Sequence, residues 1–243
     1  MKIKNVLVSQ PAPVIAEKSP FHEIVLKHRV NVEFHPFIKL EGVSLKEFRS
    51  QRVDILAHTA VIFTSRVTID NFFRICEEAR VTIPETMKYF CNTEAIALYL
   101  QKYIVYRKRK IFFAEGTFSS LGELIAKHKD EKFLLTLSEP HKPEMPLAME
   151  KMKLQFGKVI LARTVSADLD AVDVRKYDLL VFYSPSEIAS LTGKFTLGES
   201  APKIATFGHA TAKAALTEGL TVHVMAPTPE VPSMTKALDI YIR

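Results

Sequence analysis

The sequence is poor in the residues from which several common kinds of functional site are built. It has only two cysteines, eight glycines and no tryptophan in 243 residues. Cys76 and Cys91 lack the spacing of a metal site or a CxxC redox pair, and the eight histidines form neither an HxH nor an HExxH pattern. These absences predict reduced cysteines, a cytosolic setting and no metal site.

Glycine-rich phosphate loops and long apolar runs are missing as well. The sequence has neither a GxGxxG pattern nor a P-loop, so a nucleotide-dependent α/β enzyme is a weak alternative. No apolar run approaches the length of a membrane span, and the N-terminal stretch MKIKNVLVSQPAP lacks the apolar centre of a signal peptide. We therefore expect a cytoplasmic protein that does not bind a membrane.

The charge of the chain is mildly basic. It carries 33 Lys and Arg against 27 Asp and Glu, which suits a polyanionic ligand but most often reflects only solubility. The densest basic run, Tyr106 to Lys110, can be interpreted as a nucleic-acid patch or as a basic turn beside a strand. Because the run is single and short, the turn is favoured, and we expect no nucleic-acid partner.

One local pattern occurs several times in the chain. Ala60–Phe63 is a short apolar run without alternation, as expected for a strand that helices cover on both faces. Thr64 and Ser65 can then cap a helix that extends to about Ala79. Arg66 adds a positive charge directly after the turn.

The same order of strand, polar turn and helix returns later. In Tyr177–Leu191 the strand is Leu179–Phe182, Ser184 corresponds to Ser65, and Ser186 is a candidate helix cap. The chain is therefore predicted to contain two copies of one α/β unit. Further segments with this order are Lys88–Leu100 and Lys203–Leu216.

These turns are candidate anion sites. Open parallel sheets bind ligands where strands end and helices begin, and the free amides of a helix N-terminus favour an anion. The alternative is a set of ordinary capped helices with a solvated arginine.

Two segments fit crossovers between domains. Pro36 interrupts the extended stretch Val32–Leu40, and Ser166–Asp173 is acidic and poor in large apolar residues. The other expected strands are Asn5–Val8, Phe133–Leu137, Lys158–Val165 and Val222–Met225, and the other expected helices are Pro13–His28, Ser44–Arg52, Gly116–His128, one that reaches Phe156, and Met234–Ile242.

Taken together, these landmarks resemble the uroporphyrinogen-III synthase family over essentially the whole chain. The motifs that carry the resemblance are VLVSQP at the start, IFTSR at 62–66, LLVFYSPS at 179–186, FGHATAKAALTEG at 207–219 and APTPEVPSMTKAL at 226–238. It implies two similar α/β domains with parallel, Rossmann- or flavodoxin-like sheets, joined by two crossover strands with an active-site cleft between them. Residues 1–36 with 166–243 would form one domain and residues 37–165 the other. We expect a monomer.

The resemblance also implies the chemistry. An enzyme of this family is a cyclising hydro-lyase of heme biosynthesis that converts hydroxymethylbilane into uroporphyrinogen III. The bilane loses its hydroxyl, ring D attacks through a spiro intermediate and inverts, and the macrocycle closes without a metal or an organic cofactor. The substrate is a linear tetrapyrrole whose many carboxylates need many hydrogen-bond donors. We therefore expect the enzyme to act mainly by positioning the bilane and less by acid catalysis.

Site residues are implied by the same resemblance. Thr211 is the candidate catalytic hydroxyl that assists departure of the leaving group, with an ordinary helix cap as the alternative. His209 is either a solvated turn residue or a general acid. The candidate substrate-binding residues are Ser65, Arg66, Asn92, Thr93, Ser184, Ser186, Gly208 and His209.

Some positions depart from the family pattern. Ser9 and Gln10 stand where the family often has an arginine before a proline, Cys91 replaces a glycine, and Glu94 stands where threonine is common. A carboxylate at position 94 would lie near a polyanionic substrate. The alternatives are therefore an inactive relative of the synthase, or a two-domain module that binds or senses an acidic small molecule.

Overall fold

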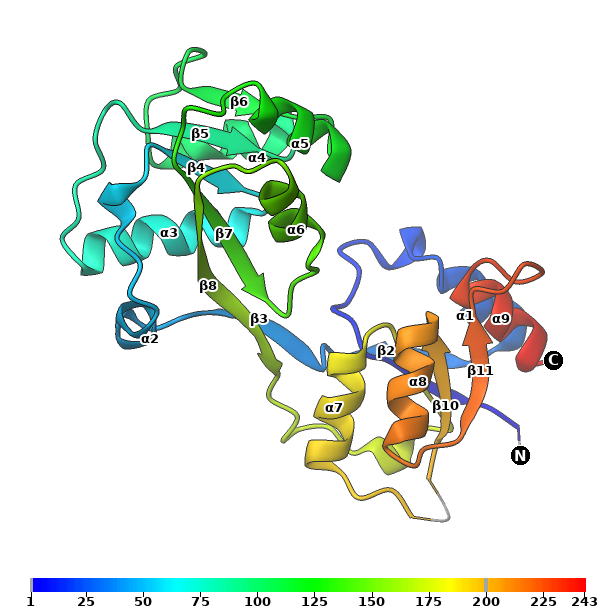
Figure 1. Cartoon of the computed structure of the whole chain (residues 1–243). Coiled ribbons are helices and arrows are strands. Elements are labelled where there is room, and N and C mark those ends of the chain that lie inside the picture. The colour runs from blue at the N-terminus through cyan, green and yellow to red at the C-terminus, as the bar shows by residue number, and fades with distance from the viewer. Residues whose placement is uncertain (1, 199–200) are drawn as a thin grey trace. The chain divides into compact units, whose positions relative to one another are not determined.

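The computed structural model describes residues 2–198 and 201–243, which form two compact α/β units (Figure 1). Unit 1 comprises Met1–Lys39 and Val165–Arg243, and unit 2 comprises Leu40–Thr164. None of the helices in these described residues is long and apolar enough to span a membrane.

The sheet of unit 1 has the strand order β11-β10-β9-β1-β2, and its neighbouring strands are parallel. Its central strand β9 is buried along its whole length, because helices cover both faces of a parallel sheet. β2 lies at the edge, and it ends before Pro36, which has no amide to donate to a ladder. The strands are β1 (Asn5–Val8), β2 (Asn31–Phe34), β9 (Leu179–Phe182), β10 (Lys203–Phe207) and β11 (Val222–Ala226).

The sheet of unit 2 has the order β3-β8-β7-β4-β5-β6, and the neighbouring strands from β8 to β6 are parallel. The chain passes between the units within β3 and β8, because the unit boundaries fall after Lys39 and after Thr164. The strands are β3 (Ile38–Gly42), β4 (Ala60–Phe63), β5 (Lys88–Cys91), β6 (Ile111–Phe113), β7 (Phe133–Glu139) and β8 (Phe156–Ser166).

The two sheets share one spatial strand order, although the chain enters them at different strands, and this order confirms the correspondence of segments that the internal repeat predicted. In unit 1, β9 lies between β1 and β10, with β2 beyond β1 and β11 beyond β10. In unit 2, β4 lies in the same way between β7 and β5, with β8 and β6 beyond them, and β3 is an additional edge strand. The expected fold class, two similar α/β domains with parallel sheets, is therefore also confirmed.

Helices follow most of these strands, and several begin directly after a capping serine, as was expected at Ser65. Ser65 caps α3 and Ser233 caps α9, each by accepting from the amide three residues on. Ser44 and Glu47 form a capping box at α2. The helices are α1 (His22–His28), α2 (Leu45–Ser50), α3 (Arg66–Glu78), α4 (Glu94–Tyr99), α5 (Phe118–Ala126), α6 (Glu144–Lys151), α7 (Pro185–Lys194), α8 (His209–Thr217) and α9 (Met234–Tyr241), with short 3-10 turns η1 (Ala16–Lys18), η2 (Ile55–Ala57), η3 (Leu100–Lys102) and η4 (Val174–Lys176).

Three expectations about element boundaries are wrong. The helix expected from Pro13 is divided into η1 and α1, because Ser19 is extended ahead of Pro20. The helix expected to reach Phe156 ends with α6, since Lys153 has a positive φ of 54° and β8 follows. The expected crossover Ser166–Asp173 lies almost entirely beyond the crossing strand, because β8 already carries the chain between the units.

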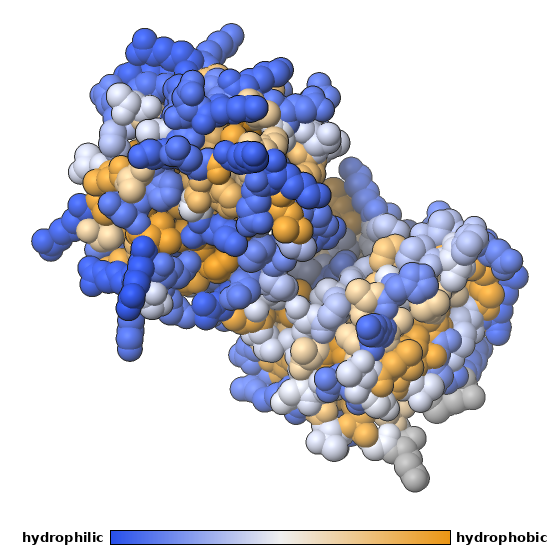
Figure 2. Space-filling view, in the orientation of Figure 1, coloured by the Kyte–Doolittle hydropathy of each residue, from blue (hydrophilic) through white to orange (hydrophobic). Residues whose placement is uncertain are grey.

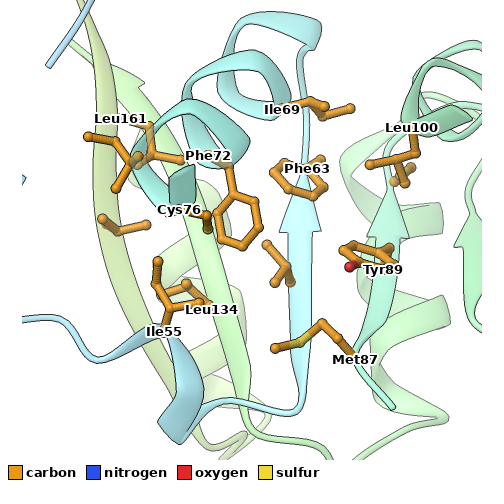
Figure 3. Packing of buried hydrophobic residues seen from close by; sticks show 14 of the residues in the cluster. Ile55, Phe63, Ile69, Phe72, Cys76, Met87, Tyr89, Leu100, Leu134 and Leu161 are labelled. Carbon is orange, nitrogen blue, oxygen red and sulfur yellow. The ribbon is translucent and has the colours of Figure 1, made fainter. Parts of the chain in front are cut away.

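The core of unit 2 fixes α3 against the sheet (Figure 3). Phe63 of β4 packs edge to face against Phe72 of α3, with ring centroids 5.4 Å apart, and stacks on Tyr89 of β5 at 6.3 Å. Burial of a phenylalanine side chain contributes about 1.5–3 kcal/mol, so these contacts hold the first turn of α3 at the end of β4. On the face seen in Figure 2, hydrophilic residues are interspersed with groups of hydrophobic residues in both units.

Candidate active site

Each sheet contains two adjacent strands from which the chain continues to the next strand on opposite sides of the sheet. In unit 1 these strands are β1 and β9, since β1 leads to β2 on one side and β9 leads to β10 on the other. In unit 2 they are β7 and β4. The carboxyl ends of such strands are the usual ligand sites of open parallel sheets. All the predicted site residues lie after these strands or after the next ones, β5 and β10.

In unit 1 the buried carboxylate of Glu187 binds the hydrogen-bond donors at the ends of β1 and β9. Glu187 in α7 accepts hydrogen bonds from the Ser9 hydroxyl at 2.8 Å and from the backbone amides of Tyr183 at 2.6 Å and Ser184 at 3.0 Å. Burial raises the pKa of the Glu187 carboxyl, and these hydrogen bonds act in the opposite direction. The amides of Tyr183 and Ser184 are therefore already used and are not open to a substrate anion.

Ser184 is the cap of α7, and the expectation that Ser186 is the cap is wrong. The Ser184 hydroxyl accepts from the Glu187 amide at 3.4 Å, and the Glu187 side chain bonds back to Ser184, which completes a capping box. Ser186 lies within the first turn of the helix and is half-buried. The glutamate three residues after Ser184 is the sequence signal that distinguishes the two serines.

The next strand end of unit 1 begins α8 without a side-chain cap. Gly208 precedes the helix with a φ of +91°, and its amide donates to the Ala226 carbonyl at 2.6 Å. Among the described residues no side chain accepts from the first turn of α8. The amides of that turn, from His209 onward, are thus available to a carboxylate of a ligand.

Thr211 lies in this first turn and is only 2% exposed. The alternative interpretation of Thr211 as a helix cap is wrong, because the cap position belongs to Gly208. His209, in contrast, is exposed beside it. The packing of α8 on the sheet therefore restricts the Thr211 side chain to one location, as a positioned hydroxyl requires.

In unit 2, Ser65 and Arg66 follow β4. The Ser65 hydroxyl accepts from the Thr68 amide at 3.2 Å and donates to the Thr68 hydroxyl at 3.2 Å, so Ser65 is committed to capping α3. Arg66 is exposed, and its guanidinium lies 5.1 Å from the centre of the Tyr99 ring. Arg66 is thus the positive charge that unit 2 presents at the end of its central strand.

Asn92 and Thr93 follow the neighbouring strand β5. The Asn92 amide donates to the Phe63 carbonyl at the end of β4 at 3.0 Å, and its Nδ2 donates to the Gly116 carbonyl at 3.4 Å. Its buried Oδ1 has no partner among the described residues. Thr93 caps α4 by accepting from the Ile96 amide at 3.3 Å. The structure therefore brings Asn92 to the same edge as Ser65.

Sequence reasoning missed two sets of polar residues at these strand ends. Glu187 is the first of these, and its spacing of three residues from Ser184 is the local signal of its part in a capping box. No local signal identified Asp70, whose carboxylate accepts from the hydroxyls of Tyr99 and Tyr103 on the next helical segment. These partners are about thirty residues apart in sequence and meet only through packing.

The described part of the chain contains no group of three His, Cys, Asp or Glu side chains that could hold a metal ion. Both cysteines are free and buried, and burial raises the pKa of each thiol to about 12. Neither thiol is therefore activated as a nucleophile.

The fold and these strand ends define a two-unit α/β protein whose candidate site is suited to an anionic small molecule. A comparison with family models then identifies the group to which it is related. The model described as "Uroporphyrinogen-III synthase HemD" matches residues 19–236. The chain belongs to the uroporphyrinogen-III synthase family, which confirms the resemblance of its motifs, and the enzyme of that family is a cyclising lyase of tetrapyrrole biosynthesis.

Solved structures of this family have the same fold. The uroporphyrinogen-III synthetase of Helicobacter pylori is 14% identical, with a TM-score of 0.54, and the match covers 99% of each chain. A mutant uroporphyrinogen III synthase of Thermus thermophilus is also 14% identical, with a TM-score of 0.50, covering 98% of this chain and 97% of the other. At this identity the likeness concerns the fold alone. No curated protein matches the sequence.

Proposed function

We propose that this chain converts hydroxymethylbilane into uroporphyrinogen III at the strand ends described above. The observation that carries this proposal is the family match over residues 19–236, which includes every candidate site residue. The availability of donors at those strand ends supports it, because the substrate carries many carboxylates. Nothing in the fold or the comparisons favours a module that only binds or senses a small molecule.

The two units would contribute different kinds of donor to the substrate. Unit 2 offers the Arg66 guanidinium, whereas unit 1 offers the uncapped amides after Gly208. Asn92 would hold the start of this edge through its bond to the Gly116 carbonyl, since its unpartnered Oδ1 is an acceptor and cannot bind a carboxylate. Charge-assisted hydrogen bonds of both kinds are stronger than neutral ones, so a polycarboxylate binds without buried lysines. Ser65, Thr93 and Ser184 would support the site through the helix starts that they cap.

Ser186 and His209 would have more peripheral roles. Ser186 lies within the first turn of α7, next to amides that Glu187 already occupies, and His209 is exposed at the start of α8. Both side chains would contact substrate carboxylates at the margin of the site. In this proposal His209 binds substrate and does not act as a general acid.

Catalysis would depend mainly on holding the bilane in a folded conformation. The departing hydroxyl takes up a proton from solvent and leaves as water, which gives a stabilised cation. Ring D then attacks through its substituted carbon and rearranges, and a proton returns to solvent as the macrocycle closes. Thr211 would donate a hydrogen bond to the departing hydroxyl, since α8 fixes this side chain beside the uncapped amides. Placement of ring D over the reacting carbon would supply most of the rate enhancement.

We further propose that the residues act as two domains, 1–36 with 166–243 and 37–165, that close on the substrate in a cytoplasmic monomer. Family membership supports the two-domain arrangement, and the free, buried cysteines suit a reducing compartment. A lid-like closure would exclude water from the cation.

The proposal is tested by turnover of freshly generated hydroxymethylbilane at neutral pH, with the oxidised products separated into isomers I and III by chromatography. Formation of isomer III well above a protein-free control is the expected result. Formation of isomer I alone, at the uncatalysed rate, would show that the chain is an inactive relative or a binding module.

A further inference from the structure

The Tyr99 ring lies beneath Arg66, the exposed cation that directly follows the turn after β4. The guanidinium carbon of Arg66 is 5.1 Å from the ring centre, within the range of a cation–π contact. Arg66 is exposed, and no carboxylate of the described residues forms an ion pair with it. The ring is therefore its main partner on the protein surface.

Asp70 holds Tyr99 in place. The Tyr99 hydroxyl donates to the two carboxylate oxygens of Asp70 at 2.9 Å and 3.0 Å. The same carboxylate binds the ammonium of Lys102 at 2.9 Å and the hydroxyl of Tyr103 at 2.5 Å. Because Asp70 belongs to α3 and the other residues to α4 and the turn after it, this cluster ties the two segments together.

The second tyrosine of the cluster lies away from Arg66. The Tyr103 ring stacks on Phe73 with centroids 4.5 Å apart, and Lys102 lies 5.1 Å from the Tyr103 ring centre. Tyr103 therefore shares the Asp70 carboxylate with Tyr99 but does not contact the guanidinium. This difference makes Tyr103 a matched control for Tyr99.

The charges of the cluster leave Arg66 as the cation that is open to a ligand. Lys102 also lies over the Tyr99 ring, 5.5 Å from its centre, but its charge is paired with Asp70. The Arg66 guanidinium is held by the face of the ring alone, and such a contact leaves the N–H groups at its edge free. A guanidinium with free edges suits a carboxylate, which it can bind through two parallel hydrogen bonds.

We propose that Tyr99 is a positioning residue that holds Arg66 in the orientation for binding a substrate carboxylate, and that Asp70 fixes Tyr99 in turn. The inference rests on the proposed function and adds to it a residue that touches no reacting atom. It attributes to Tyr99 an effect on substrate affinity through Arg66 and no effect on the chemical step.

The test compares Tyr99→Leu, Tyr99→Phe and Tyr103→Leu in the full chain. Tyr99→Leu should raise KM about two- to fivefold, the size of one exposed cation–π contact, with kcat unchanged. Tyr99→Phe keeps the ring but loses the hydroxyl that Asp70 holds, so its KM should lie between those of the wild type and Tyr99→Leu. Tyr103→Leu removes a bond to Asp70 and a stacked ring without touching Arg66, so its KM should stay at the wild-type value.

A double-mutant cycle identifies Arg66 as the group through which Tyr99 acts. In an Arg66→Ala background, Tyr99→Leu should have no further effect on KM. Full additivity of the two substitutions, or an equal rise in KM for Tyr103→Leu, would overturn the inference.

Binding of uroporphyrin III to the same variants, followed by fluorescence, separates this inference from the proposed activity. The wild-type chain and Tyr99→Phe should bind this polycarboxylate more tightly than Tyr99→Leu does. If the wild-type chain forms no isomer III, the proposed activity fails while the porphyrin affinities still decide the role of Tyr99. Equal affinities in all variants would refute that role even in an active enzyme.

Discussion

The Ser9 hydroxyl donates a hydrogen bond of 2.8 Å to the Glu187 carboxylate across 178 residues of sequence. The contact joins the end of the first strand of unit 1 to the helix that follows β9. The same carboxylate also accepts from two backbone amides, so one side chain satisfies three donors. They lie at the ends of β1 and β9, where the strand connections run in opposite directions across the sheet. The Glu187 carboxylate thus occupies donors at the ends of β1 and β9 that would otherwise be open to a ligand.

Replacement of Glu187 tests the importance of this contact for stability. Glu187→Leu leaves the buried Ser9 hydroxyl and two part-buried amides without an acceptor, and it should lower the free energy of unfolding by about 2–3 kcal/mol. Glu187→Gln keeps an acceptor oxygen and should cost less. Urea denaturation measures both. The control is Glu77→Leu on the exposed face of α3, expected within about 0.5 kcal/mol of wild type, and an equal loss there would contradict the prediction.

Gly208 is needed for its backbone conformation. Its φ is +91°, whereas a Cβ atom at this position would meet nothing closer than the Thr211 hydroxyl at 4.0 Å. Gly208→Ala should therefore destabilise the protein by about 1–2 kcal/mol through strain, and it should slow formation of isomer III by displacing the amides of α8. A Cβ atom added at Gly193 in α7 would meet nothing within 4 Å. Gly193→Ala should therefore raise the free energy of unfolding by about 0.5 kcal/mol. Equal unfolding midpoints for the two variants would refute the argument.

Thr211 is tested by removing its hydroxyl while keeping its shape. Thr211→Val should lower kcat about tenfold with little change in KM, because a hydrogen bond to the leaving group contributes about 1.4 kcal/mol in the transition state. Thr211→Ser should recover most of the activity. Rates are measured as isomer III formed per unit time, with circular dichroism to check that the variants fold. A Thr211→Val variant with wild-type kcat would exclude the role in leaving-group departure.

Asp239 in α9 gives a prediction for pH. Its carboxylate contacts Lys27 at 2.6 Å and His28 at 2.8 Å, and these hydrogen bonds hold the pKa of Asp239 well below its usual range. Because the folded-state pKa is the lower one, the stabilisation is present above the unfolded value of about 3.9 and is lost as the pH falls below it.

The measurement compares wild type with Asp239→Asn by urea denaturation at several pH values. The wild-type protein should be the more stable of the two at pH 7, and the difference should shrink as the medium is acidified below about pH 4. A difference that stays constant to about pH 3 would show that the ion pair does not contribute in this way.

The sequence by itself determined the local units and their repetition. Each strand-turn-helix unit depends on an apolar run and on a cap whose hydroxyl binds an amide three residues later, as at Ser65 and Ser233. Interactions over so few residues can be recognised without knowing the rest of the fold. The same is true of Gly219, which has the positive φ of 74° expected after a helix. Family membership could likewise be inferred, because it depends on the order of these units.

Only the tertiary structure decided which polar groups are already used and which are open to a ligand. Ser184 and Ser186 look alike in sequence, but Glu187 joins Ser184 to Ser9 and occupies the nearby amides. Arg66 gains its place on Tyr99 from a helix that packs beside its own. Such contacts join residues far apart in the chain, and their geometry follows from how helices pack on a sheet, which no local pattern of residues specifies.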